Sequence, residues 1–504
     1  MAPLKHRAVA SSFIFKFPED DMTKKPQVAL FRRSGQVSTY QHKYAGVSGS
    51  VEETDDNPLA TAWREIKEET TLTSDSLRLF RQGKPFSFAD ESIGRKWTIN
   101  PFGFVLKSEK EGGRGEASIQ IDWEHEGYEW FDPAVVNESE DFQGVPRILE
   151  SLRRVWFNID LGEAAGKTLA EGLTVLQADH ESGARQLASK ALGIFIKVIR
   201  QLDTGDRDKW WKNVRFAGWH LWKNGRESMG ASILNVVLAS LKLIEQRLPS
   251  QDTVSTDSVN GMIAELEKYA QERQDSGSKV SASLETFLEQ TIPGNEPLRI
   301  LTLSSSSTIT SGIIRVLSKM SRRPVEVRVL ESRPLFEGVK MASAIGSFVE
   351  ENKANARLVI YTDASVGVAA KDVDVVLIGA DLIDKTANVS NKTGSLPAVL
   401  TAKHVSPKSK IVVLSEKEKV LPFNPPGQEE NDPHEVTQAW AGLTPSTTKG
   451  PNNTHIDVKN IYFEWIPASL IDHYVTEDGI STSEGISEWA GEVHKRADQF
   501  FTDL

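Results

Sequence analysis

The sequence contains no cysteine among its 504 residues. This absence excludes disulfide bonds, zinc sites built on thiolates and any thiol nucleophile, and it fits a reducing compartment. The chain also lacks an uninterrupted apolar run of about 20 residues, the length needed to cross a bilayer. From these absences we expect a cytoplasmic protein without a membrane partner.

An excess of positive charge is also missing. Lysine and arginine number 59 against 70 aspartate and glutamate residues, so the formal net charge is -11 at pH 7. Nucleic-acid backbones are bound by clustered basic side chains, and we therefore expect no direct nucleic-acid partner. Nucleotides and small phosphorylated ligands need only local positive charge. The length allows two or three domains, each with its own core.

Residues 49–72, GSVEETDDNPLATAWREIKEETTL, combine an acidic loop with a helix that is predicted to start near Pro58. Glu65, Glu68 and Glu69 stand at i, i+3 and i+4, so they share one face of that helix. Three adjacent carboxylates repel one another unless a cation neutralises them. Magnesium suits them, because it takes oxygen ligands and is often shared between carboxylates and substrate phosphates. The alternative is an ordinary charged helix that faces solvent.

This stretch resembles the Nudix box, whose pattern is G, five residues, E, seven residues, then R-E-U-x-E-E-x-G-U, with U aliphatic. The matching residues in an alignment without gaps are Arg64, Glu65, Ile66, Glu68, Glu69 and Leu72. The resemblance implies a Nudix hydrolase that holds Mg²⁺ or Mn²⁺ through Glu65, Glu68 and Glu69. It also implies that Arg64 fixes a carboxylate and that Asp56 supports the loop.

Three positions depart from the family pattern. Ser50 replaces the first glycine, Asp56 the first glutamate and Thr71 the last glycine. Loss of glycine restricts the backbone conformations of a loop, and aspartate is one methylene shorter than glutamate. The sequence therefore leaves open a site that binds its ligand but catalyses weakly.

Strands of the same region are predicted from their β-branched and aromatic residues at 8–17, 27–33, 97–106 and 128–131. The glycine-rich segment 107–117 is predicted to be a hairpin loop between the last two. The resemblance adds a late acid near the metal, Glu124 or Glu126, although both could equally face solvent. We expect this first domain to span residues 1–155.

A helical region follows, which we expect to form a subdomain over 156–292. Apolar residues recur at three-to-four spacing over 187–202, 230–248 and 258–274. The tryptophans nearby are predicted to pack a layer of helices rather than a ligand; they are Trp210, Trp211, Trp219 and Trp222.

Residues 293–504 alternate short apolar strands with helices. Near-continuous apolar runs occupy 298–304, 325–332, 356–363, 373–381 and 410–416. Such runs are typical of a parallel sheet that is covered on both faces. The expected fold class is therefore α/β, with a parallel sheet in this part of the chain. The Nudix resemblance implies an α/β/α sandwich for the first domain.

Polar clusters follow these strands, at 304–308, 331–334, 363–365 and 379–381, with 391–394 shortly after. Ligands of open α/β sheets bind at the carboxyl ends of the strands. Hydroxyls, backbone amides, one arginine and one lysine suit a phosphorylated sugar. A single polar residue there would be only a helix cap, whereas several clusters in succession favour a site.

This half resembles the family that joins methylthioribose-1-phosphate isomerase, ribose-1,5-bisphosphate isomerase and the regulatory subunits of the exchange factor for eukaryotic initiation factor two. The matching segments are 179–184, 226–229, 300–308, 329–338, 361–367, 378–397 and 465–480. The resemblance implies a helical subdomain that leads into a Rossmann-like domain, and a homodimer formed through that domain. It also implies a catalytic Asp381. The ligand-binding residues that it implies are Arg226, Ser304, Ser305, Arg333, Asn391 and Lys392.

The isomerases of this family use a cysteine where this chain has Ser304. A hydroxyl cannot replace a thiolate without an activating base, and no histidine follows in the loop. Isomerisation and silent sensing of a sugar phosphate or nucleotide both remain open for this half.

The sequence as a whole predicts a magnesium-dependent hydrolase fused to a domain that binds or isomerises a phosphorylated sugar. Its substrate would be a nucleoside diphosphate linked to a second group, with a sugar as the leading choice. The alternative is a non-enzymatic, translation-factor-like regulator or ligand sensor. Two loops, 422–435 and 442–454, are expected to be flexible; the alternative is that they form a lid over the C-terminal site.

Overall fold

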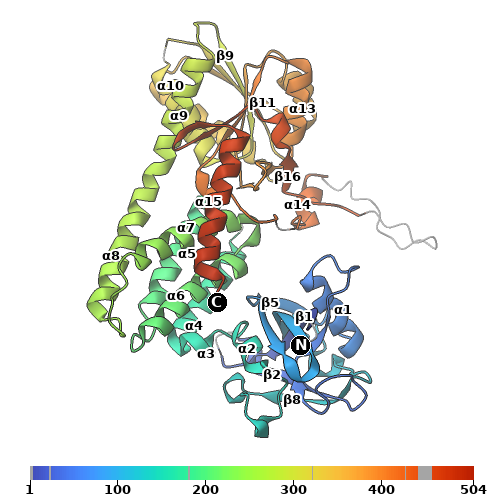
Figure 1. Ribbon diagram of the computed structural model, residues 1–504. Helices are drawn as coiled ribbons and strands as arrows, with labels where there is room; N and C mark the ends of the chain where they lie inside the picture. The colour runs from blue at the N-terminus through green and yellow to red at the C-terminus, as the bar shows by residue number, and fades with distance from the viewer. Residues whose placement is uncertain (1–3, 22–23, 180–181, 321, 426, 441–456) are drawn as a thin grey trace, which may run out of the picture.

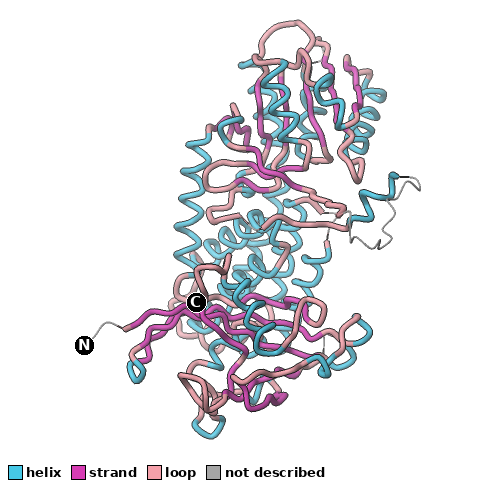
Figure 2. Tube along the Cα trace, turned by 90° about the vertical axis from the view of Figure 1, so that its right-hand side faces the viewer, coloured by secondary structure: helices cyan, strands magenta, loops and turns pink. Residues whose placement is uncertain are grey.

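The computed structural model describes residues 4–21, 24–179, 182–320, 322–425, 427–440 and 457–504. A strand-rich N-terminal region and a second sheet lie at opposite ends of the molecule (Figure 1). Figure 2 shows that a layer of helices separates these two strand-rich ends. The predicted α/β class is confirmed: a mixed sheet, a helical stretch and a largely parallel sheet follow one another along the chain.

The N-terminal sheet has eight strands, and its central path runs β3-β2-β1-β7-β5. The long strands β1 and β7 pair in parallel, whereas the other pairs are antiparallel, so the sheet is mixed. The strands are β1 Lys5–Lys16, β2 Gln27–Arg33, β3 Tyr44–Ala45, β4 Val47–Ser50, β5 Leu77–Gln82, β6 Phe86–Asp90, β7 Arg95–Leu106 and β8 His125–Phe131.

The predicted hairpin at 107–117 is wrong. β8 pairs with β2, where Tyr128 lies opposite Phe31, and it does not pair with β7. Both edges of β7 are already occupied, by β1 on one side and by β5 and β6 on the other. The segment between β7 and β8 instead forms two short 3₁₀ turns, at Glu109–Glu111 and Gly115–Ser118.

Helix α1, Pro58–Thr70, carries the acidic motif against this sheet. Asn57 caps it by accepting hydrogen bonds from the amides of Leu59 and Ala60, and Pro58 occupies the first turn. Its buried face, which includes Ala62 and Ile66, packs on one side of the sheet. The other side is covered by a second apolar cluster that includes α2, Ile148–Arg153.

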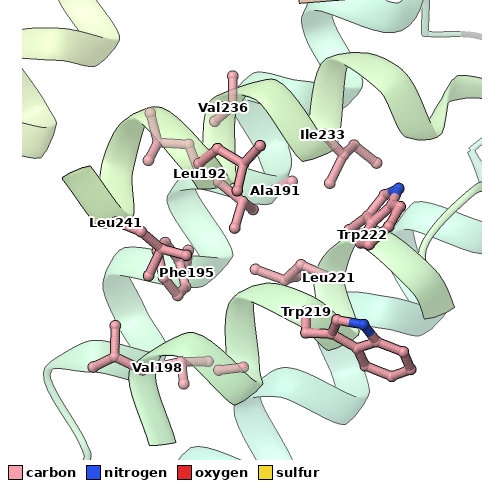
Figure 3. Close-up of a cluster of buried hydrophobic side chains, with 14 of the residues drawn as sticks. Ala191, Leu192, Phe195, Val198, Trp219, Leu221, Trp222, Ile233, Val236 and Leu241 are labelled. Atoms are coloured by element: carbon pink, nitrogen blue, oxygen red, sulfur yellow. The ribbon is translucent and has the colours of Figure 1, made fainter. Parts of the chain in front are cut away.

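The helical layer consists of α3 Asn158–Leu161, α4 Glu163–Ala178, α5 Ala184–Ile199, α6 Arg207–Asn224, α7 Gly230–Glu245 and α8 Thr256–Glu272. As predicted, the tryptophans pack this layer: Trp210, Trp219 and Trp222 are buried in its core, and Trp211 lies against it. Figure 3 shows Trp219 and Trp222 beside aliphatic side chains of α5 and α7.

The second sheet has the order β11-β10-β9-β12-β15-β17-β18 and is parallel except for the last pair. From β9 in the middle of the sheet, the chain adds β10 and then β11 toward one edge. It then returns to β12, beside β9, and adds β15, β17 and β18 toward the other edge. The strands are β9 Leu298–Leu303, β10 Val325–Leu330, β11 Ala356–Tyr361, β12 Val375–Ile378, β15 Lys410–Leu414, β17 His473–Thr476 and β18 Gly479–Ser481.

A small antiparallel sheet and several helices complete this half. The sheet joins β13 Leu382–Ile383, β14 Val389–Lys392 and β16 Phe463–Ile466. The helices are α9 Ser276–Thr291, α10 Ser307–Lys319, α11 Glu337–Asn352, α12 Val366–Ala369, α13 Ser395–Val405, α14 Pro433–Thr437 and α15 Ser483–Phe501. The predicted loop 442–454 lies outside the described residues.

Two helices join the layer of helices to the second sheet. Leu284 and Phe287 of α9 are buried in the core of that sheet. α15 runs back along the helical layer (Figure 1), where Val493 and Phe500 enter its core. The division into 1–155, 156–292 and 293–504 stays a proposal, because these helices pack across its last boundary. No helix of the described residues is long and apolar enough to span a membrane.

The N-terminal sheet is attached to the helical layer through β5. The backbone of Gln82 exchanges two hydrogen bonds with the Asn224 side chain of α6, at 2.7 and 2.9 Å. The Arg154 guanidinium donates to the carbonyl of Leu504 at 3.2 Å. The first domain is therefore fixed to both the middle and the end of the chain.

Thr71, where the Nudix pattern has glycine, ends α1 in a left-handed conformation with φ of 60°. A β-branched residue is strained there, and the left-handed region costs roughly 1–2 kcal/mol for residues with a Cβ. We expect Thr71→Gly to raise the free energy of unfolding of the N-terminal domain by about 1 kcal/mol. Thermal unfolding of the full chain checks this, with Thr71→Ala as the control that retains Cβ. Equal midpoints for the glycine and alanine variants would contradict it.

Candidate functional site

Helix α1 presents the three predicted acids in different environments. Glu65 has a 14% exposed side chain and lines a cavity of about 410 Å³. Glu68 is 58% exposed and faces solvent. Glu69 is buried and its Oε2 lies 2.5 Å from Nε2 of His125, a β8 residue that the sequence did not single out.

Arg64 organises the acids of the loop and the helix. Its guanidinium donates to Asp55 at 2.9 and 3.1 Å, to Glu65 at 2.7 Å and to the carbonyl of Ser50 at 3.2 Å. Arg64 therefore fixes a carboxylate as expected. The prediction for Asp56 is wrong, however, because Asp56 is exposed and its neighbour Asp55 supports the loop.

Gly49, next to Ser50 in β4, lies directly against Glu65. A Cβ on Gly49 would lie 1.9 Å from the Glu65 carboxyl group. Gly49 and Asp55 have the six-residue spacing of the family pattern, and one extra residue then separates Asp55 from Arg64.

Negative charge is concentrated around the cavity end that holds Glu65. Burial raises the pKa of Glu65, against the opposing effect of Arg64, and Glu68 and Glu124 add to the rise. Burial also raises the pKa of Glu69 well above its usual value, with further contributions from Glu124 and Glu65. The mutual repulsion of these carboxylates favours a bound cation.

The donor set suits a hard divalent cation. Glu69 Oε1 is buried without a hydrogen-bond partner among the described residues, and Glu65 and Glu124 both line the cavity. Carboxylate oxygens are the ligands that Mg²⁺ and Mn²⁺ prefer. Within the described part of the chain, however, no three acidic or imidazole side chains already stand together as a metal centre. Glu68 in particular must turn inward to take part.

The second candidate site lies where the order of the parallel sheet reverses, between β9 and β12. Ligands of such sheets bind in the crevice at this switch point. A cavity of about 350 Å³ opens there, and the predicted residues Ser304, Ser305, Asp381 and Asn391 line it. The strand order thus brings two distant strand ends together.

Asp381 is surrounded by cations. Burial raises the pKa of its carboxyl group, while Lys419, Lys392 and Arg226 act in the opposite direction. Asn391 donates to Ser395 Oγ at 2.9 Å, which orients its amide. The crevice can therefore hold an anionic ligand next to a carboxyl group.

Lys419 and Arg185 line the same cavity, although the sequence did not single them out. Lys419 donates to the carbonyl of Ala380 at 2.7 Å and lies 3.6 Å from buried Glu416. Arg185 lies 3.6 Å from the same carboxylate. A signal existed for Lys419, since the polar run 416–419 follows the predicted strand at 410–416.

The structure does not bring Arg226, Arg333 and Lys392 into the lining of this cavity. Arg226 donates to Glu429 at 3.3 Å, Arg333 to the carbonyl of Val436 at 3.0 Å, and Lys392 pairs with Glu337 at 3.0 Å. Two of these partners belong to residues 427–440, which include part of the expected flexible loop and form α14. Their role in ligand binding stays a prediction.

Among the described residues, the hydroxyl of Ser304 forms no hydrogen bond with a histidine, lysine or carboxylate side chain, although Asp381 and Lys419 line the same cavity. Its backbone adopts a φ of 67°. Its amide donates a hydrogen bond to Ser332 Oγ at 2.7 Å. Ser332 and Arg333 in turn donate their amides to Asp363 at 2.9 and 2.8 Å. The loop after β9 is thus held by the strand ends of β10 and β11.

The fold and the two sites define a two-part protein: an acidic site suited to a diphosphate, and a switch-point crevice suited to an anionic ligand. The NUDIX domain family matches residues 11–152. The Initiation factor 2 subunit family matches residues 180–483, more than half of the chain. The chain belongs to this second family and carries a Nudix domain before it. His180 and Glu181, part of the first segment of that resemblance, lie outside the described residues.

Similar proteins include isomerases and initiation factors. The methylthioribose-1-phosphate isomerase of Desulforamulus reducens is 27% identical over 201 residues, 37% of this chain and 53% of the relative. A putative translation initiation factor eIF-2B subunit 2-like protein of Pyrococcus furiosus is 26% identical over 175 residues, 34% and 54% of the two chains. The chain thus spans about half the length of these curated relatives.

Solved structures resemble the same region. The translation initiation factor eIF-2B of Pyrococcus horikoshii has a TM-score of 0.44 and 20% identity, covering 62% of this chain and 96% of that one. The 5-methylthioribose 1-phosphate isomerase of the same organism has a TM-score of 0.45 and 14% identity, covering 65% and 87%.

Glu477, whose carboxyl group is influenced by Glu416 of the Lys419 ion pair, makes the stability of the folded protein depend on pH. Burial raises its pKa from 4.5 to about 7. Because the pKa of Glu477 in the folded state exceeds its unfolded value, the protonated carboxyl group stabilises the folded protein. This stabilisation is complete below about pH 4.5 and is lost as pH rises through 7. We expect Glu477→Gln to raise the free energy of unfolding at pH 8 by up to about 3 kcal/mol. Urea unfolding at pH 4.5 and 8 checks this; a gain of equal size at both pH values would contradict it.

Proposed function

We propose that the N-terminal domain is a Mg²⁺- or Mn²⁺-dependent hydrolase of a nucleoside diphosphate linked to a second group, with a sugar as the leading choice. The observation that carries this proposal is the set of mutually repelling carboxylates at one end of a cavity that also contains arginines. Glu65, Glu69 and Glu124 would hold the cation, and Glu68 would join them after turning inward.

The residues of this chain have separable tasks in that reaction. Arg64 holds Glu65 and Asp55 in place, and Gly49 leaves the room that the Glu65 carboxylate needs. Glu65 and Glu124 both face the cavity, so either can accept a proton from the attacking water. A bound divalent cation supplies charge neutralisation on the diphosphate and a more acidic water.

We expect Glu65→Gln to lower kcat/KM by roughly 100-fold or more, because a ligand or base is lost while the fold is retained. Product analysis with nucleoside diphosphate sugars, ADP-ribose, dinucleotides and nucleoside triphosphates measures this. Glu140→Gln is the matched control, since Glu140 is exposed and remote from the cavity lining. The thermal shift caused by Mn²⁺ should also shrink in Glu65→Gln. Unchanged turnover and an unchanged metal response would refute the hydrolase.

The C-terminal domain is proposed to bind or isomerise a phosphorylated sugar in the crevice beside Asp381. Its support is the cluster of hydroxyls, Lys419 and Arg185 around that carboxyl group, together with the isomerases among the similar proteins. A homodimer through this domain is part of the proposal. Exposed apolar residues on and around the edge strand β11 support it, namely Leu335, Phe336, Val339, Ile360 and Val368.

We expect Asp381→Asn to abolish isomerisation of 5-methylthioribose 1-phosphate or ribose 1,5-bisphosphate while leaving their Kd within a few-fold. Asparagine keeps the shape of the side chain but cannot transfer the proton. Calorimetric titration and a ketose assay measure the two properties separately. If the variant changes neither turnover nor binding, Asp381 does not belong to the site.

A second function, non-enzymatic regulation or ligand sensing, has its own support. Ser304 stands in place of the catalytic cysteine without a hydrogen-bonded base among the described residues, and Arg226 and Arg333 already have partners within the chain. Ser304→Cys distinguishes the two functions of this domain. Gain of isomerase turnover in that variant, with none in the wild type, would favour a sensor that keeps the geometry of an enzyme.

A further inference from the structure

A single imidazole, that of His125 at the start of β8, lies against the last acid of α1. Its side chain is 1% exposed, and its Nε2 lies 2.5 Å from Oε2 of Glu69. Among the ion pairs of the described residues, those of Arg64 involve Glu65 and Glu68, and that of Glu69 is formed with His125. Glu69 therefore depends on a partner that the other two acids do not share.

A β-bulge in β8 aims this imidazole at α1. On β2, Arg32 pairs with Gly127. The next residue, Arg33, pairs with His125, so Glu126 is left over as an extra residue of β8. An extra residue reverses the face from which the next side chain of the strand projects. His125 therefore takes the face that regular pairing would have given to Glu126.

The packing of the two side chains agrees with this bulge. The ring centroid of His125 lies 5.1 Å from that of Phe31, a residue of the apolar cluster on which α1 packs. Glu126 instead lies 3.4 Å from the guanidinium of Arg32. Regular pairing would turn the Glu126 carboxylate toward Glu69, and neighbouring carboxylates repel each other. The bulge thus replaces a repelling neighbour of Glu69 with a hydrogen-bond partner.

The surroundings of the imidazole decide which nitrogen carries the proton when Glu69 is ionised, as a metal ligand must be. Nδ1 of His125 is buried and has no hydrogen-bond partner among the described residues, whereas Nε2 faces Glu69 Oε2. A proton on Nδ1 would leave a buried N–H without an acceptor and would set the lone pair of Nε2 against a carboxylate oxygen. We therefore assign the proton to Nε2, which donates to Glu69.

This hydrogen bond gives the two oxygens of Glu69 different tasks. Oε2 accepts from the imidazole, whereas Oε1 is buried with no partner in the part of the chain that the structure describes. Glu69 follows Glu65 by one helical turn on the same face of α1, and Glu65 lines the cavity. Fixing Oε2 holds the carboxylate in one orientation and leaves Oε1 for a cation.

We propose that His125 is a positioning residue of the metal site: its Nε2–H holds Oε2 of Glu69, so that the carboxylate meets the cation through Oε1. His125 itself touches neither the metal nor the substrate. Glu124, which precedes it in the chain, lines the cavity, so one short segment supplies a ligand and orients another. The proposal rests on the proposed hydrolase function and deepens it.

The test is the affinity of the full chain for Mn²⁺, measured by calorimetry at one fixed pH. We expect His125→Leu and His125→Asn each to raise the Kd about ten- to hundredfold, the usual effect of losing the partner of a metal ligand. Leucine has no donor, and asparagine is too short to bring its amide to Glu69. His125→Gln should stay within a few-fold of wild type, because its longer side chain carries an N–H to the place of Nε2. Either of the first two variants suffices if the other does not fold.

Two controls separate positioning from loss of packing. His220→Leu removes a fully buried histidine of the helical layer that bonds to Asn224. It should lower the midpoint of thermal unfolding and leave the Kd for Mn²⁺ unchanged. In a Glu69→Ala background, titrated at higher Mn²⁺ concentration, His125→Leu should have no further effect on the Kd, since His125 acts only through Glu69.

The outcomes distinguish the positioning role from the hydrolase function. An unchanged Kd in His125→Leu and His125→Asn would overturn the positioning role and leave the hydrolase intact. An equally high Kd in all three variants, or an undiminished effect in the Glu69→Ala background, would do the same by assigning the effect to packing. If the wild type binds Mn²⁺ with the expected dependence on His125 but cleaves no diphosphate, the positioning role stands and the hydrolase fails. Absence of Mn²⁺ binding by the wild type would refute both.

Discussion

The apolar core of the helical layer is the contact on which the arrangement of the whole chain depends. It combines side chains from α4 to α8 with Phe157, directly after the Nudix region, and with Phe500 and Leu504 at the end of α15. Leu382 and Leu421 of the C-terminal half enter the same core. Each fully buried side chain of this size contributes about 1.5–3 kcal/mol. The layer therefore joins the end of α15 and parts of the C-terminal half through one apolar core, whereas the N-terminal domain is attached to it by the hydrogen bonds of Gln82 and Arg154.

Within the first domain, electrostatics sets the site. In the part of the chain that the structure describes, Arg64 is the one cation that pairs with Asp55, Glu65 and Glu68, and it places the loop acid against the helix. Neighbouring carboxylates repel the charged forms of Glu65 and Glu69, and burial favours the neutral forms further, so the pKa values of both are raised. If a divalent cation binds here as proposed, the acids that define the site are those that it would reorganise.

The two candidate sites suit related ligands in different ways. The first joins acids and arginines in one cavity, whereas the second joins hydroxyls, Lys419 and Arg185 around Asp381. Hydrolysis of a nucleoside diphosphate sugar would release a sugar phosphate, the class of ligand proposed for the second site. In the proposed function, the serine at position 304, where the related isomerases use cysteine, separates conversion of that ligand from sensing.

The sequence by itself determined the elements whose signal is local. The spacing of Glu65, Glu68 and Glu69, the helical periodicity around the tryptophans, and the apolar strands with their polar ends depend on residues near one another in the chain. Only the tertiary structure decided which of these meet. Strand order placed Ser304 and Asp381 in one crevice and added Lys419, and pairing with β2 rather than β7 placed β8. The conformation of the loop placed Asp55, and not Asp56, against Arg64. Such outcomes depend on contacts between distant segments, which local periodicity does not encode.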